Sequence, residues 1–203
     1  MSKPLFALAV PAAIAASAMI AAPATAQKKP SIDQVETHLR GTSSLTAQFT
    51  QTDGKNRSVN GVLSLKRPGK VRFDYGKNAN MLMVSDGSNL HFIDYEVGQK
   101  SSWKIKDSPL SVLLERNPDL DRIARIVPSK DDRVVIVRAR DSRRPEFGTL
   151  IMAFTKSSGS PGGLRLEGWT AIDAQNKRTA VKLTGQKYNV SVPDSRFAYR
   201  EPK

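Results

Sequence analysis

The sequence predicts a mainly β protein: a large antiparallel sheet of about eleven strands, strongly curled or closed into a barrel, with a few short amphipathic helices. Strand-like runs in which apolar and polar residues alternate recur at short intervals from Leu45 onward. The connections between these runs are turn sequences such as Pro68-Gly69 and Asp86-Gly87. Only two segments of the mature chain carry a helical pattern.

The first 26 residues predict a secretory signal peptide, because Lys3 precedes an Ala-rich apolar run that ends in Ala24-Thr25-Ala26. A membrane anchor is the alternative, since Leu5–Ala22 is nearly long enough to span a bilayer, but Pro11 interrupts this run and Pro23 follows it. The 203 residues contain no cysteine, so neither a lipid-attachment cysteine nor a disulfide framework is available. We expect residues 27–203 to form one exported domain.

The first elements are a short helix and a strand. Ser31-Ile-Asp-Gln34 has the form of a capping box, and the apolar residues that follow it have helical spacing until Gly41. Alternation then predicts a strand that starts at Leu45. The further predicted strands are 59–66, 71–75, 81–85, 89–95, 98–105, 133–140, 148–155, 163–172, 178–185 and 188–192.

The segment 107–128 interrupts the strands with a second helical pattern. Ser108 is suited to cap a helix and Pro109 to occupy its first position. The apolar stripe of this helix consists of Leu110, Leu113 and Leu114, and after Asn117-Pro118 a second short helical turn would carry Leu120, Ile123 and Ala124. Both helical segments have an apolar face, and the nearest surface that can bury these faces is the concave side of a curled sheet.

The charge of the chain favours anionic partners. Its formal net charge is +13, and Lys3 is the only charged residue of the first 26. Phospholipid head groups, acidic proteins and nucleic acid would all be attracted. The basic residues are spread over the whole chain without an RNA-binding signature, and export argues against nucleic acid.

Catalytic and metal-binding motifs are absent from the sequence. The two histidines, His38 and His91, lie in no zinc motif, and their expected role is structural. Ser101-Ser-Trp-Lys104 matches S-x-x-K but lies in a strand pattern, and no nucleophile elbow or P-loop occurs. We expect a protein that is not an enzyme and binds no cofactor or metal.

A row of residues on the strand 59–66 raises a physical question. Its period of two places Leu63, Leu65 and Arg67 on one face, and a charge facing an apolar interior is costly without hydrogen-bond acceptors. The strand ending at Lys66 with Arg67 in solvent is the simplest interpretation. Met81 and Met83 also share one strand face, as a flexible core or as the lining of an adaptable site.

The segments AQFTQ, GVLSLKRPGKVRFDY, MLMVSDGSNLHFID, SPLSVLLERN and LEGWTAIDAQN occur in the order and spacing of LolA-type outer-membrane lipoprotein carriers. The chain resembles this family over 31–199, most specifically at Lys66-Arg67-Pro68 and Ser85-Asp86-Gly87. The resemblance implies a half-open antiparallel barrel with a helical lid over an apolar cavity. It also implies a periplasmic, monomeric carrier that moves lipoproteins from an ABC-type extractor in the inner membrane to the outer membrane.

The resemblance further implies the residues of the site. Arg67 would act as a latch that hydrogen-bonds to lid backbone carbonyls at Leu39, Leu114 and Glu115, since carbonyls at helix C-termini lack partners within the helix. The expected acyl-chain cavity is lined by Leu63, Leu65, Val71, Phe73, Met81 and Met83 from the strands and by Leu110 and Leu113 from the lid.

Three alternatives stay open. An apolar cavity does not record whose chains fill it, so a lipid- or glycolipid-binding module of the same shape, or an envelope regulator that senses such ligands, fits equally. The receptor member of the same superfamily is itself a lipoprotein, whereas this chain has no cysteine. Its stretch 76–80 is short and polar, without the protruding apolar tip expected of a receptor. We therefore expect a carrier and not the receptor. Better-known carriers continue beyond the point that corresponds to Lys203, so a carrier that also delivers cargo directly is the third alternative.

Overall fold

The computed structural model describes residues 30–76 and 79–203. The predicted signal peptide, 1–26, lies outside these residues. No helix in the described part of the chain is long and apolar enough to cross a membrane.

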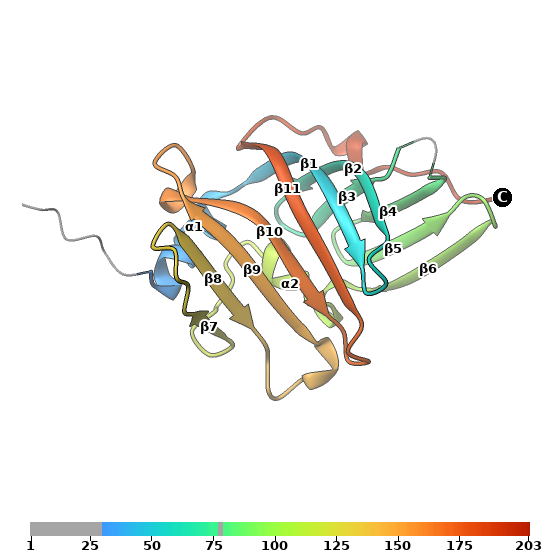
Figure 1. Ribbon diagram of the computed structural model, residues 1–203. Helices are drawn as coiled ribbons and strands as arrows, with labels where there is room; N and C mark the ends of the chain where they lie inside the picture. The colour runs from blue at the N-terminus through green and yellow to red at the C-terminus, as the bar shows by residue number, and fades with distance from the viewer. Residues whose placement is uncertain (1–29, 77–78) are drawn as a thin grey trace, which may run out of the picture.

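The fold is one open antiparallel sheet of eleven strands (Figure 1). The strands are β1 Ser44–Asp53, β2 Ser58–Lys66, β3 Lys70–Asp74, β4 Met81–Ser85, β5 Asn89–Asp94, β6 Gln99–Lys104, β7 Ala124–Val127, β8 Val134–Ala139, β9 Thr149–Lys156, β10 Leu164–Ile172 and β11 Arg178–Tyr188. Their spatial order is β6-β5-β4-β3-β2-β1-β11-β10-β9-β8-β7, so β6 and β7 are the free edges. The predicted fold class is confirmed.

Helices are few and short in the described residues. They are α1 Ile32–Gly41, α2 Ser111–Leu114 and the 3₁₀ turns η1 Ile105–Asp107, η2 Pro145–Phe147, η3 Pro161–Gly163 and η4 Asp194–Phe197. Ser31 caps α1 by accepting a hydrogen bond from the Gln34 backbone N–H. The capping-box prediction is therefore correct at its first residue, whose side chain satisfies one of the four free N–H groups of the helix.

The main core lies on the concave side of the sheet. Leu45, Ala47 and Phe49 alternate inward along β1, as their period of two predicts, and are at most 5% exposed. Val35 and Leu39 from α1 and Leu113 and Leu114 from α2 pack into the same cluster as these strand residues. The two helices therefore cover the concave side, as their apolar faces predict.

A second, smaller core lies on the other face of β4 and β5. Leu82, Val84 and Ile93 point to this face and pack against Val192 and Phe197 of the C-terminal segment. The segment is also fixed by ion pairs from Lys66 and Lys70 to Asp194, at 2.7 and 3.1 Å. Both faces of this half of the sheet are thus covered.

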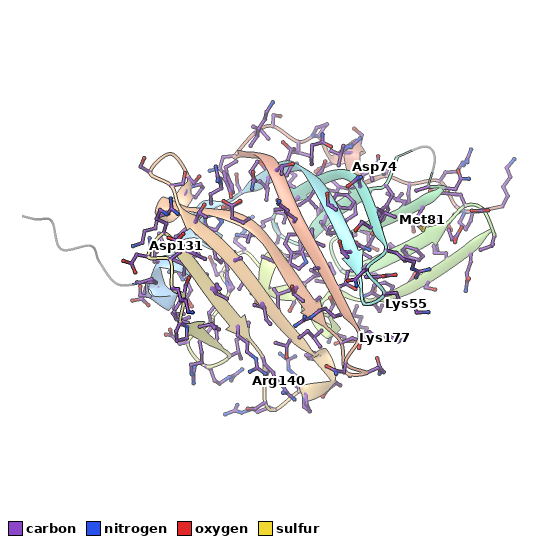
Figure 2. The ribbon with its side chains drawn as sticks, in the orientation of Figure 1. Lys55, Asp74, Met81, Asp131, Arg140 and Lys177 are labelled. Atoms are coloured by element: carbon purple, nitrogen blue, oxygen red, sulfur yellow. The ribbon has the colours of Figure 1, made fainter. Side chains whose placement is uncertain are left out.

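The two ends of the strands carry different turns. Figure 2 shows Lys55 and Lys177 close to each other at one end and Asp131 at the opposite end. The β1–β2, β8–β9 and β10–β11 connections lie at the first end, as does the β5–β6 connection further along the sheet. The β2–β3, β4–β5, β7–β8 and β9–β10 connections lie at the second end.

Two predicted elements differ in the structure. The second helical turn is a single hydrogen-bonded turn and not a helix: Leu120 O accepts the Ile123 and Ala124 N–H groups at 3.1 and 2.7 Å, Glu36 Oε1 accepts the Leu120 N–H at 2.7 Å, and β7 begins at Ala124. Residues 188–192 form no separate strand. β11 instead runs on to Tyr188, and the chain turns at Asn189, whose φ is 54°.

Candidate functional site

The turn between β2 and β3 holds Arg67 at the end of the apolar row. The Arg67 backbone N–H donates to Ser43 O at 2.9 Å, and Gly69 follows with φ 74°. A side chain at Gly69 would also meet Gly87 O, so both the conformation and the available space require glycine. The turn is therefore pressed against the β4–β5 turn.

Hydrogen bonds join these two turns and explain why their motifs occur together. Ser85 Oγ donates to Gly69 O and accepts the Gly87 backbone N–H at 3.1 Å. Ser85 is completely buried. The Lys66-Arg67-Pro68 and Ser85-Asp86-Gly87 motifs thus form one contact.

The joined turns also hold the end of α2. Arg67 Nε donates to Leu113 O at 2.8 Å, and the Gly69 backbone N–H donates to Leu114 O at 2.9 Å. Both acceptors are carbonyls of the last helical turn, which lack partners within the helix. Burial lowers the pKa of Arg67 to about 10, so the guanidinium stays protonated at neutral pH.

The backbone carbonyl that accepts from Arg67 is not one of those expected, which were Leu39, Leu114 and Glu115. Arg67 bonds to Leu113, because the Leu114 carbonyl is already taken by Gly69. Glu115 ends α2 by donating its own N–H to Ser111 O at 2.9 Å, and Leu39 O accepts the Thr42 N–H at 3.3 Å. Within the described residues, Arg67 Nη1 is buried and has no hydrogen-bond partner.

The helix α1 is attached to the sheet by other contacts. Gln34 Nε2 donates to Gly162 O at 3.2 Å, and the Nδ1 of His38 bonds to Pro161 O at 2.9 Å, which makes Nδ1 the protonated nitrogen. Burial lowers the pKa of His38 to about 4; the Pro161 bond opposes this shift, and the nearby charge of Arg67 adds to it. His38 therefore has the structural role expected from the sequence.

A cavity of about 380 Å³ lies beside α2 on the concave side. Phe73, Met83 and Leu110, three of the eight predicted lining residues, line it. Its further apolar and aromatic lining residues are Leu90, Trp103, Pro109, Phe147, Trp169, Ala171, Ala174 and Val181. The other lining residues are polar or charged: Gln51, Asp107, Ser108, Glu146, Asp173, Gln175, Lys177 and Thr179. The apolar part of this lining suits an apolar ligand.

Four other predicted lining residues belong to the closed core. Leu63, Leu65, Val71 and Leu113 are each at most 4% exposed, because the helices and their own neighbours cover them. The concave side thus has a filled end beneath the helices and an open end at the cavity.

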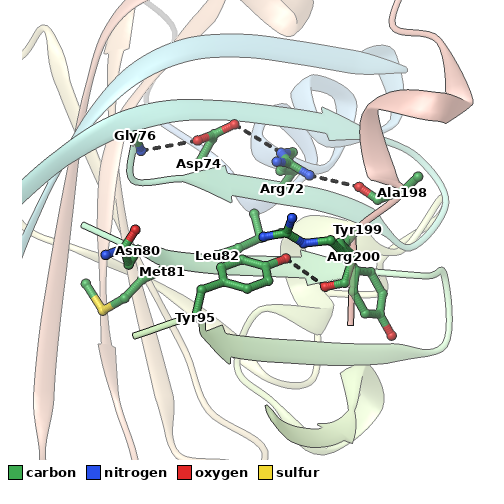
Figure 3. Close-up of a pocket in the computed structure, with 10 residues that line it drawn as sticks. All are labelled: Arg72, Asp74, Gly76, Asn80, Met81, Leu82, Tyr95, Ala198, Tyr199 and Arg200. Atoms are coloured by element: carbon green, nitrogen blue, oxygen red, sulfur yellow. Dashed lines mark hydrogen bonds and ion pairs between the residues drawn. The ribbon is translucent and has the colours of Figure 1, made fainter. Parts of the chain in front are cut away.

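Met81 packs against the main core and lines a different pocket, which Figure 3 shows near the C-terminal segment. This pocket is more polar in its contacts: Arg72 donates to Ala198 O at 3.0 Å and Tyr95 Oη donates to Arg200 O at 2.9 Å. Asp74 also pairs with Arg72 at 3.2 Å. The pocket at the C-terminal segment and the cavity beside α2 have no lining residue in common.

The contribution of β10 to the cavity was missed in the sequence. Leu164 and Leu166 face inward, and strict alternation would next place Gly168 inward. A register shift between Leu166 and Gly168 instead turns Trp169 and Ala171 to the cavity. Gly168 has φ 151°, and a side chain there would meet Val181 O. The glycine before a tryptophan was the available signal.

The chemistry of this site is that of binding. Within 30–76 and 79–203, no group of three or more His, Asp or Glu side chains is placed to hold a metal ion. An open sheet whose concave side has two helices and a cavity with an apolar lining defines a carrier of apolar ligands.

The comparison with protein families is specific. Residues 40–200 match the family described as outer membrane lipoprotein carrier protein LolA. The chain belongs to this family, whose members are carriers.

Individual relatives agree over almost the whole chain. An outer-membrane lipoprotein carrier protein from Chromobacterium violaceum is 29% identical over 209 aligned residues, which cover 99% of this chain and 96% of the relative. A protein of the same name from Cupriavidus taiwanensis is 26% identical over 205 residues, covering 94% and 93%. A solved structure of a LolA superfamily protein from Nitrosomonas europaea covers 82% of this chain and 96% of its own, with 10% identity and a TM-score of 0.43.

Proposed function

We propose that the mature protein, residues 27–203, is a monomeric periplasmic carrier that shields the acyl chains of lipoproteins. It would take them from an ABC-type extractor in the inner membrane and pass them to an acceptor at the outer membrane. The observation that carries this proposal is the cavity of about 380 Å³ with its apolar and aromatic lining, next to a helix held by Arg67, in a chain of the LolA family.

The energetics require shielding. Three acyl chains expose on the order of 45 methylenes, and at about 0.8 kcal/mol each their transfer into water costs roughly 35 kcal/mol. Release through water is therefore negligible, and cargo has to move between apolar environments in direct contact. The carrier also has to bind the chains less well than its acceptor does.

Movement of α2 would let the cavity grow. The observed cavity is smaller than three acyl chains require, while Leu63, Leu65, Val71 and Leu113 form a filled core beside it. If α2 leaves the Arg67 turn, this core becomes additional lining. An open lid exposes its own leucines to water, which holds down the affinity for cargo.

The test is photo-cross-linking in cells, with a photoreactive residue in place of Leu110 and, as the control, in place of the exposed Thr184. We expect lipoproteins in the Leu110 adducts and none in the Thr184 adducts. Adducts of Leu110 that contain only free lipids or glycolipids would contradict lipoprotein carriage and identify a lipid-binding module.

A further inference from the structure

Three neighbouring connections lie at one end of the cavity, and the two between β8 and β9 and between β10 and β11 line it. We call them the mouth loops: 53–58 between β1 and β2, 140–148 between β8 and β9, and 173–178 between β10 and β11. A Cβ at Gly54 would lie 3.6 Å from Arg178 O, and one at Gly148 would meet Ile172 O, so the three loops are neighbours. Phe147 and Asp173 belong to these loops and line the cavity.

The mouth loops are basic. They contain seven Lys or Arg and four Asp or Glu, whereas the turns at the opposite end, 67–69, 86–88, 128–133 and 157–163, contain three of each. Figure 2 shows Lys55, Lys177 and Arg140 at the mouth end. The mouth loops thus carry a net formal charge of +3 (seven basic minus four acidic residues), while the charged residues that line the cavity itself are Asp107, Glu146, Asp173 and Lys177.

Most acidic groups of the mouth loops serve to form the turns. Asp53 accepts the Lys55 N–H at 2.9 Å, Asp141 accepts the Arg143 N–H at 3.0 Å, and Asp173 accepts the Gln175 N–H at 2.9 Å. These bonds fix the backbone of each turn. The basic side chains of the loops are exposed, and two of them pair with these aspartates: Arg57 with Asp53 at 2.7 Å and Arg144 with Asp141 at 3.2 Å.

Aromatic side chains accompany the positive charge. The Arg144 guanidinium lies 4.4 Å from the centre of the Phe147 ring, and Trp103, which also lines the cavity, is 36% exposed. Aromatic rings beside Lys and Arg are typical of surfaces that meet the head-group region of a bilayer. A bilayer accounts for both features, since anionic head groups attract the charge and the head-group region accommodates the aromatic rings.

We propose that the mouth loops dock the protein on a bilayer surface that contains anionic phospholipids, with the cavity opening toward the membrane. This inference rests on the proposed function, since a cavity held against the bilayer receives or releases acyl chains without exposing them to water. The attraction is electrostatic and would weaken with salt.

The test measures co-sedimentation of the purified protein with vesicles of phosphatidylcholine, alone or mixed with phosphatidylglycerol. The mouth variant combines Lys55→Gln, Arg140→Gln and Arg178→Gln, one from each loop, and none of the three residues lines the cavity. The control variant combines Lys130→Gln, Lys182→Gln and Lys187→Gln, which removes equal charge from exposed positions elsewhere.

We expect the parent to bind only the vesicles with phosphatidylglycerol. The mouth variant should lose affinity on the order of 100-fold, and the control about threefold or less. Equal losses in both variants would overturn the proposal. Absence of parent binding to the anionic vesicles would also overturn it, in favour of an acidic protein partner.

Fatty-acid binding by the same proteins separates this proposal from the carrier function. Both variants should bind a fluorescent fatty acid as the parent does. Failure of the parent to bind it would contradict the carrier function, while the vesicle assay would still decide whether the mouth loops dock on the membrane.

Discussion

The two helices on the concave side are held in different ways. α1 has ten residues, is capped by Ser31, and is bonded to the β9–β10 turn through Gln34 and His38. α2 has four residues, and its last carbonyls bond to Arg67 and Gly69 of a single turn. From this difference we expect α1 to stay in place as a fixed wall, whereas α2 opens when the Arg67 turn releases it.

A buried contact of α1 should matter most for stability. Leu39→Ala removes a completely buried side chain and leaves a cavity, so the free energy of unfolding should fall by about 2–5 kcal/mol. The matched variant Leu110→Ala, at the half-buried edge of α2, should cost less than half as much and weaken fatty-acid binding instead. Urea denaturation measures both, and equal losses would contradict the distinction between the helices.

Acid should also act mainly through α1. The pKa of His38 is about 4 in the folded protein and near 6.5 when unfolded, so the unfolded state takes up a proton that the folded state does not. The stability from the neutral His38 is present above pH 6.5, falls as the pH drops below that value, and is lost by about pH 4. The loss should be roughly 3 kcal/mol.

The variant His38→Gln isolates this contribution. The difference in unfolding free energy between the parent and the variant should change by that amount between pH 7 and pH 4, as measured by urea denaturation. A difference independent of pH would show that His38 is not held neutral by its burial.

Release of α2 should follow from one substitution. Arg67→Leu extends the apolar row of Leu63 and Leu65 but removes the donor to Leu113 O, so the closed position of α2 should lose roughly 1.5–3 kcal/mol. In a two-step transfer assay, lipoprotein loading should persist or improve while delivery to acceptor membranes falls. Arg67→Lys should be milder than Arg67→Leu but still impaired relative to the parent, since an ammonium donates hydrogen bonds but cannot direct several donors in a plane.

Delivery by Arg67→Leu at the rate of the parent would mean that Arg67 is no latch. The same variant should lower the unfolding free energy by no more than the roughly 1.5–3 kcal/mol lost from the closed position, because the new side chain is apolar like its neighbours Leu63 and Leu65.

The smallest effect on delivery is expected for Ser85, which supports the turn that carries Arg67. Ser85→Ala removes the hydroxyl that joins the β4–β5 turn to Gly69 O, which should loosen the closed position of α2 by about 1 kcal/mol. The transfer assay should show a defect of the same kind as for Arg67→Leu but weaker. A normal rate of delivery would show that the turn needs no support from Ser85.

The sequence predicts those features of the site that depend on residues close together in the chain, and misses those that depend on contacts between distant segments. Alternation along β1 and the capping box of α1 are local patterns, and both appear in the structure. The fate of residues 117–123 depends on Glu36, far away in the chain, which binds the Leu120 N–H. Likewise, the inward turn of Trp169 depends on a bulge paired with β9, for which Gly168 is the one local signal.

Hydrogen exchange measured by mass spectrometry tests the central claim most directly, namely that α2 opens while α1 stays in place. In Arg67→Leu, amides of residues 108–116 should exchange about tenfold faster or more than in the parent, because the closed state has lost its latch. Amides of α1 should exchange at the parent rate. Equal acceleration in both helices, or none in residues 108–116, would contradict the account.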